Sequence, residues 1–381
     1  MMQVARLYSD QRHNVVVNTI PAKSDIRGFS LVEVMVALVI GLIITAAVIK
    51  IFTMSKATYG LEEGLARVQE NGRFAIEFLS RDIRMAGYSG CNSKLGLTDA
   101  SEVANIADPP AAPTTFNPDG IKGYTYTCAS GCTGALSEWT PALPADYGFT
   151  AGEVKQGTDV IIIQSASSLS THLTGITGVT NANIQILNTA DIAGQIQADD
   201  IVMISDCKAA DTFRASGVSS GAGTITIAHA NSVNTGSTLT HLYGNDAELM
   251  KLVSTAYYIG TGASNEPALF RKTLSGITPI SQELVEGVEM MKFLFGEDTA
   301  PNADGTPDIY RNLANNVGNW RRVVAVRVGI VVKSLSDVDQ DVDTKTYEVL
   351  GDTAAGYDDY NPPDDHRRRR VFNSTIQVRN R

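Results

Sequence analysis

A long apolar run near the N-terminus dominates the hydrophobic pattern of the chain. The sixteen residues from Val34 to Ile49 carry no charge, and Phe29 to Val32 extend the run with one interruption, Glu33. A membrane-spanning helix needs about 20 predominantly apolar residues, so the pattern predicts a transmembrane helix. A carboxylate costs about 2.5–3.5 kcal/mol at mid-bilayer and less near a helix end. Glu33 therefore needs a specific partner.

The helical pattern continues beyond the apolar run. From Leu61 to Met85, apolar residues recur at helical spacing with charged residues between them, and Gly87 is a plausible stop. We predict one helix over residues 29–86, about 87 Å long at about 1.5 Å per residue. Its first half would lie in the bilayer and its second half against a globular domain.

The rest of the chain is predicted to be rich in β-strands. Residues 88–150 are rich in Gly, Pro, Ala and Thr and indicate an irregular loop region, and residues 165–240 indicate an inserted β-rich lobe. Because no long helices are interleaved, the sheet should be mainly antiparallel. The predicted fold class is α+β, with a long N-terminal α-helix attached to a β-rich globular domain over residues 87–381. The strand-like segments are 159–164, 201–205, 224–228, 249–259, 269–273, 289–295, 323–333 and 371–378, with 323–333 the best central strand.

Charge and cysteine content indicate where this domain lies. The net charge is −10; residues 1–28 carry a net charge of +2, and the remaining 353 residues carry −12. Basic residues before the apolar run keep the N-terminus cytoplasmic, so the domain should lie outside the cytoplasm. Four cysteines in an oxidising compartment suggest two disulfides, with three possible connectivities. Cys128 and Cys132 are close enough to clip a small loop, which leaves Cys91 with Cys207; metal binding is the rival interpretation.

The start of the apolar run has an unusual processing signal. Ordinary secretory signals are cleaved after their apolar region, whereas here Gly28 precedes it. The segment Arg27-Gly28-Phe29-Ser30-Leu31-Val32-Glu33 resembles the class III leader of type IV pilins and pseudopilins. This resemblance implies that residues 1–28 are a leader peptide cut by prepilin peptidase after Gly28, and that Phe29 becomes N-methylated. Glu33 would then be the assembly contact, paired with the Phe29 amine of a neighbouring subunit.

Further segments resemble the PilW type of minor pilin, among them Gly72–Leu79, Leu284–Glu289 and the terminal Arg370–Ile376. The resemblance implies a minor pilin that primes type IV pilus assembly and sits at the pilus tip, with a role in twitching motility. Its implied partners are other minor pilins, the major pilin, prepilin peptidase, the assembly machinery and inner-membrane lipid. Before assembly it would be a single-pass inner-membrane protein with a periplasmic domain. The alternatives are a J-type minor pseudopilin of type II secretion and a tip adhesin that binds through residues 165–240.

Other polar clusters have simpler explanations. Asp337 to Glu348 has nearly the spacing of a calcium-binding EF-hand loop, but Val342 stands where that loop needs Gly. Asn302 to Gly305 with Asp308 forms a second polar loop. The basic run Arg367–Arg370 could contact DNA phosphates, yet the negative charge of the domain favours internal pairing with acidic loops. The chain has no recognisable catalytic motif, so we expect no enzyme activity, cofactor, metal or nucleic acid.

Overall fold

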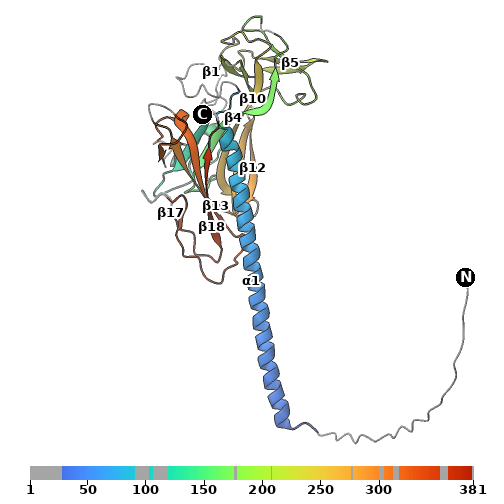
Figure 1. The fold of residues 1–381 in the computed structure, drawn as a ribbon, viewed down its shortest axis with the longest axis vertical. Coiled ribbons are helices and arrows are strands. Elements are labelled where there is room, and N and C mark those ends of the chain that lie inside the picture. Colours follow the sequence, from blue (N-terminus) through green and yellow to red (C-terminus); the bar gives the residue numbers. More distant parts are fainter. Residues whose placement is uncertain are drawn as a thin grey trace, which may run out of the picture. The chain divides into compact units, whose positions relative to one another are not determined.

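The structure is a computed structural model that describes residues 28–90, 103–105, 119–175, 178–206, 208–275, 278–299, 304–311, 317–351 and 359–379. The chain divides into two compact units, Met1–Ala57 and Thr58–Arg381. Figure 1 shows the long helix, drawn in blue, and the strands that follow it, coloured from green to red. The helix α1 spans Leu31–Met85, and its last 28 residues belong to the second unit.

The C-terminal half of α1 presents a narrow stripe of small and aliphatic residues to the β-domain. Six of the buried positions follow one another at three- or four-residue intervals, so they lie on one face of the helix. They are Gly64, Val68, Gly72, Ala75, Leu79 and Ile83, and Ser80 beside Leu79 is buried as well. A Cβ atom added to Gly72 would lie 2.3 Å from the ring of Phe372. At Gly64 it would lie 3.0 Å from the side chain of Val338. Glycine at these positions lets the domain approach the helix backbone.

A nine-stranded sheet forms the larger part of the β-domain. Its strand order is β1-β7-β6-β10-β4-β2-β3, and β11 and β12 extend it from β10. All pairs are antiparallel except β1 with β7. The strands are β1 Val103–Asn105, β2 Ile121–Tyr126, β3 Trp139–Thr140, β4 Val160–His172, β6 Ile201–Ser205, β7 Ala210–Arg214, β10 Glu248–Thr261, β11 Pro267–Ser275 and β12 Thr278–Glu286.

A four-stranded antiparallel sheet lies close to the helix stripe. Its order is β14-β13-β15-β18, formed by Ile309–Arg311, Val288–Glu297, Val323–Lys333 and Arg369–Gln377. A three-stranded sheet has the order β5-β9-β8, formed by Ile184–Leu187, Thr224–Ala228 and Gly217–Ser220. A two-stranded sheet pairs β16 (Tyr347–Glu348) with β17 (Asp359–Tyr360). Short 3-10 helices span Leu136–Glu138, Ala145–Tyr147 and Trp320–Arg322.

The main hydrophobic core joins the helix stripe to both large sheets. Leu79 and Ile83 of α1 pack in one cluster with residues of β4, β10, β13, β15 and β18. A separate cluster fills the lobe between residues 173 and 249. Because β6 and β7 of this lobe are hydrogen-bonded into the nine-stranded sheet, the lobe is continuous with the main domain.

The predicted fold class is confirmed: a long N-terminal helix precedes mainly antiparallel sheets. The strand predicted over 323–333 is β15, and it lies between β13 and β18. The structure differs from the prediction in the region 88–150, where an irregular loop was expected. There β2 pairs with β4 and β3 pairs with β2. Gly123 and the polar residues of β2 hid its strand character, because the neighbouring strands supply most of its stabilisation.

The close approach of the domain to the helix predicts opposite effects for two glycine substitutions. Gly72→Ala gains about 1 kcal/mol of helix propensity, but its Cβ would overlap Phe372, and overpacking costs about 1–3 kcal/mol. We expect a net loss of stability. Gly60→Ala is the matched control, since no atom lies within 4 Å of its added Cβ, and it should be stabilising by up to about 1 kcal/mol. Denaturant midpoints followed by tryptophan fluorescence of the detergent-solubilised protein measure both; equal shifts would contradict the packing argument.

Candidate functional site

The N-terminal end of α1 carries the residues predicted to be processed. Gly28, Phe29 and Ser30 precede the helix, and the amide of Val34 donates a hydrogen bond to the carbonyl of Ser30 over 3.2 Å. The Phe29 side chain is 82% exposed. Glu33 lies in the first helical turn, where the helix dipole favours a negative charge. The predicted cleavage position and the carboxylate are thus one turn apart.

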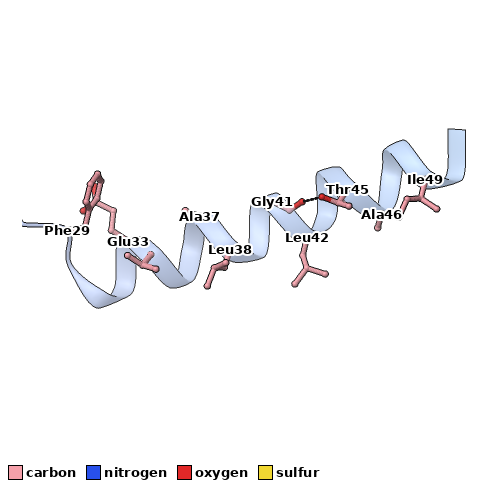
Figure 2. A pocket seen from close by; sticks show the side chains of 10 residues that line it. Phe29, Glu33, Ala37, Leu38, Gly41, Leu42, Thr45, Ala46 and Ile49 are labelled. Carbon is pink, nitrogen blue, oxygen red and sulfur yellow. Dashed lines mark hydrogen bonds between the residues drawn. The ribbon is translucent and has the colours of Figure 1, made fainter. Parts of the chain in front are cut away.

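Glu33 lies on a helix face made of small side chains. Ala37, Gly41 and Thr45 follow it at four-residue intervals, and these residues line a shallow hollow along the helix together with Phe29 and apolar neighbours (Figure 2). The hydroxyl of Thr45 donates a hydrogen bond to the carbonyl of Gly41 over 2.8 Å. This internal bond satisfies the hydrogen-bonding capacity of the Thr45 hydroxyl. Glu33 is the one charged residue among those that line the hollow. Small residues of this kind let a second helix approach closely in a membrane.

The first half of α1 is suited to a membrane by length and composition. Its most apolar 18-residue window has a mean hydropathy of 2.7, and none of that window is buried by the rest of the chain. Apolar surface exposed to water costs about 25 cal/mol per Å², so this segment is stable only when lipid or another protein covers it. Among the described residues, no ion pair involves Glu33. A carboxylate in lipid is stabilised when it pairs with a cation.

The cysteines are described in part. Cys128 and Cys132 form a disulfide, as the short spacing predicted. Directly after the loop that they close, the carboxylate of Glu138 accepts hydrogen bonds from the amides of Thr133 and Gly134. Glu138 and the two cysteines come close enough to form a metal-ligand group, but disulfide-bonded sulfur has no thiolate to offer a metal. Cys91 and Cys207 lie outside the described residues, so their pairing stays a prediction.

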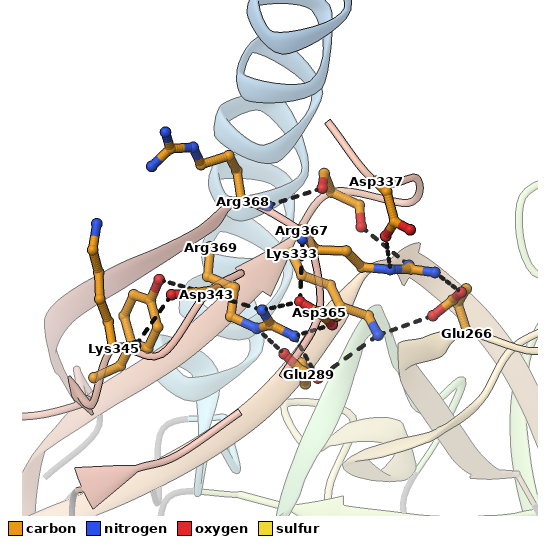
Figure 3. A network of polar contacts seen from close by, with 12 residues as sticks. Glu266, Glu289, Lys333, Asp337, Asp343, Lys345, Asp365, Arg367, Arg368 and Arg369 are labelled. Carbon is orange, nitrogen blue, oxygen red and sulfur yellow. Dashed lines mark hydrogen bonds and ion pairs between the residues drawn. The ribbon is translucent and has the colours of Figure 1, made fainter. Parts of the chain in front are cut away.

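Three arginines of the basic run, Arg367, Arg368 and Arg369, are paired with carboxylates of the chain, and Figure 3 shows the pairs made by Arg367 and Arg369. Arg367 binds Glu266 at 2.6 Å, and Arg368 binds Asp339 at 2.6 Å. Arg367 also lies 3.6 Å from Asp337. Asp337 and Asp339 belong to the segment whose spacing resembled an EF-hand loop. Their charges are therefore balanced by the basic run, and the internal pairing favoured by the sequence is present.

Arg369 is the centre of this network. Its side chain is fully buried and contacts Glu289 at 2.7 Å, Asp365 at 2.6 Å and Asp343 at 3.1 Å. Burial opposes the charge of Arg369, yet the hydrogen bonds that it donates to Asp365 and Glu289 hold its pKa above the ordinary value. Burial alone would raise the pKa of the Glu289 carboxyl, but Arg369 holds it below the usual range. Lys333 lies 3.0 Å from Glu266 and 3.7 Å from Glu289 and extends the network.

Sequence reasoning did not identify Glu289 and Lys333 as members of this network. Glu289 sits in β13, whose residues are all buried, and Lys333 ends the apolar strand β15. A charged residue inside a buried apolar strand is a signal that a partner of opposite charge exists. That signal does not say which residue is the partner, because Arg369 is 80 positions away in the chain.

Two families match the chain, and together they identify the class of protein. The prokaryotic N-terminal methylation motif matches residues 23–49, which contain Gly28, Phe29 and Glu33. An N-terminal methylation motif at the start of an exposed apolar helix is the pattern of type IV pilin-like proteins, and the helix is long and apolar enough to cross a membrane. The family described as type IV pilus-assembly protein W matches residues 256–380, from the second half of β10 through β18. The chain is thus a type IV pilin-like protein with a PilW domain, and its resemblance to PilW-type minor pilins is confirmed.

Comparison with solved structures finds a type IV-like pilin from Thermus thermophilus. The two chains are 10% identical, and the match covers 82% of this chain and 98% of the other, with a TM-score of 0.33. A comparison with curated proteins found no match. The PilW match includes β13, β15 and β18, which pack against the helix stripe.

The buried ion network predicts a specific pH dependence of stability. The pKa of Glu289 is held below that of the unfolded chain, so its contribution is fully present above about pH 4.5 and is lost as the pH falls further. Glu289→Gln should lower the free energy of unfolding at pH 7 by about 3 kcal/mol or more, and this difference should shrink below pH 4.5. Denaturant titrations at pH 7 and pH 3.5 measure it.

Glu63→Gln provides the control for this prediction, because Glu63 forms an exposed pair with Arg67. Exposed pairs contribute about 1 kcal/mol or less, so this variant should resemble the wild type at both pH values. A Glu289→Gln variant that is equally destabilised at pH 7 and pH 3.5 would show that the ionised carboxylate is not what stabilises the domain.

Proposed function

We propose that this protein is a minor pilin that primes assembly of a type IV pilus within a tip complex of minor pilins. The observation that carries the proposal is the joint presence of the methylation motif at the start of α1 and a PilW domain packed on the other half of the same helix. In such a protein, the apolar half of α1 would pack in the filament and the β-domain would contact partner proteins. The protein would wait in the inner membrane with its β-domain in the periplasm, and would reach the pilus tip when the filament grows.

In this proposal, the helix face that carries Glu33 makes the contact between neighbouring subunits. Cleavage after Gly28 would leave an α-amino group on Phe29 that is positively charged at neutral pH. The amine of one subunit can pair with Glu33 of its neighbour, and the other residues on the face of Glu33 are uncharged. Pairing removes the cost of a lone carboxylate in lipid and fixes the axial offset between two helices. The same logic serves a secretion pseudopilus, but the PilW match supports the pilus role.

Processing is tested first by N-terminal mass spectrometry of the native protein from cells with and without prepilin peptidase. We expect an N-methylated Phe29 that depends on the peptidase. An intact leader in peptidase-positive cells, or cleavage beyond Ile49, would overturn the proposal, because Glu33 would then have no neighbouring amine to bind.

The role of Glu33 is tested by Glu33→Ala as the only copy in the cell. Processing should remain intact, since the substitution leaves Gly28 and Phe29 unchanged. Surface pili should fall at least about tenfold, because breaking a buried ion pair costs about 3–5 kcal/mol and each 1.4 kcal/mol is a factor of ten. Glu62→Ala, an exposed carboxylate of the same helix, is the control and should leave pili at the wild-type level. Normal piliation with Glu33→Ala would refute the assembly role.

A further inference from the structure

The connection between β2 and β3 brings two sulfur atoms and a carboxylate together. The sulfurs of Cys128 and Cys132 and a carboxylate oxygen of Glu138 all lie within 4.8 Å of one another. The three residues are half-buried, so small molecules in the solvent can reach them. The proposed role in the pilus does not account for this group.

Strand pairing holds the start of the connection beside Glu138 without help from the disulfide. Tyr126 of β2 is paired with Trp139 of β3, and the amide of Thr127 donates a hydrogen bond to the carbonyl of Glu138 over 2.9 Å. Trp139 is 2% exposed and packs in a hydrophobic cluster of the domain. Cys128 follows Thr127 directly, so the pairing keeps it near Glu138 when the sulfurs are no longer bonded.

The Glu138 carboxylate holds the other end of the connection. It accepts hydrogen bonds from the amide of Thr133 over 2.5 Å, from the Thr133 hydroxyl over 3.0 Å and from the amide of Gly134 over 3.0 Å. None of these bonds involves sulfur, and Cys132 directly precedes Thr133. Desolvation opposes the charge of Glu138, but the hydrogen bonds from Thr133 and Gly134 hold its pKa below the ordinary value. The carboxylate is therefore ionised at neutral pH and already oriented.

We propose that this group is a redox-controlled site for a borderline-soft divalent cation of the Zn²⁺ type, bound by Cys128, Cys132 and Glu138 when the disulfide is reduced. Zn²⁺ takes thiolate sulfur and carboxylate oxygen in a tetrahedral arrangement, and three protein ligands leave the fourth position to water. Soft thiolate ligands disfavour Ca²⁺ and Mg²⁺.

The geometry of the chain fits such an ion. At a Zn–S distance of about 2.3 Å, two sulfurs of a tetrahedral site lie about 3.8 Å apart, within the span that the group already has. The Cα atoms of Cys128 and Cys132 are 6.0 Å apart, so both side chains can reach a common ion. A carboxylate that ligates a metal is itself hydrogen-bonded in well-formed sites, as that of Glu138 is.

The switch between the two states is a thiol–disulfide exchange with a dithiol reductant. A thiolate of the reductant attacks one sulfur and forms a mixed disulfide, which the second thiol of the reductant then resolves. The reductant becomes a disulfide, and Cys128 and Cys132 each gain one electron and one proton. Binding of Zn²⁺ displaces the two thiol protons into solvent. Oxidation reverses both steps, so the connection holds either a disulfide or a metal ion.

Zinc titration of the full chain tests the proposal. The protein is purified in detergent, stripped of metal with a chelator and reduced with a phosphine, which adds no competing thiol. We expect the reduced wild type to bind one more equivalent of Zn²⁺ than the reduced Cys128→Ser/Cys132→Ser variant. Cys91 and Cys207 are common to both chains, so the difference reports the proposed site. Co²⁺ in place of Zn²⁺ should give a thiolate-to-metal charge-transfer absorption that the variant lacks.

Glu138→Gln tests the third ligand. It should weaken Zn²⁺ binding by about tenfold or more, since even groups that only support a ligand change metal affinity by about 10–100-fold. Glu63→Gln is the control, because Glu63 is an exposed helix residue paired with Arg67, and it should bind Zn²⁺ as the wild type does. If Glu138→Gln fails to fold, as judged by circular dichroism, the comparison with the cysteine variant decides the outcome.

Three results would overturn the proposal. They are equal Zn²⁺ binding by the oxidised and reduced wild type, equal binding by the reduced wild type and the cysteine variant, and unchanged affinity in a folded Glu138→Gln variant. Each of them leaves the proposed pilus role untouched, because that role depends on Glu33 and Phe29.

Discussion

The fold depends on the close packing of one helix against the end of the chain. Gly72 brings the backbone of α1 into contact with Phe372, and Gly64 does the same for Val338. Leu79 and Ile83 continue this stripe into the core formed by both large sheets. The helix is therefore a structural part of the domain over its second half and an uncovered apolar rod over its first. One secondary structure element serves a water-exposed domain and a membrane, and its composition changes where the environment changes.

The ion network around Arg369 stabilises the position of β18 by electrostatic attraction. It joins β18 to β13 through Glu289, and to the segment before β18 through Asp343 and Asp365. Hydrophobic packing holds one side of β18 against the helix and does not discriminate well between neighbouring registers. A buried cation with three carboxylate partners is satisfied in one register alone, so the network adds specificity to the packing. Arg367, Arg368 and Arg369 of the basic run are thus paired within the protein, as the sequence favoured.

Much of this architecture could be predicted from the sequence. The strands over 201–205, 224–228 and 323–333 have the predicted bounds, because β-branched runs between polar residues specify them locally. The partners of Arg369 could not be predicted, since they come from distant strands. Glu33, by contrast, could be singled out from the sequence, because the motif that contains it is made of contiguous residues.

The contact between Gly72 and Phe372 joins residues 300 positions apart in the chain. During synthesis the helix emerges well before the strand that covers its stripe. The stripe therefore stays uncovered until the segment that contains Phe372 has been made, and the domain can close on its helix only after that. Domains dominated by such distant contacts fold slowly. Anchoring in the membrane and maturation of the domain are thereby separated in time, with β18 as the final closure.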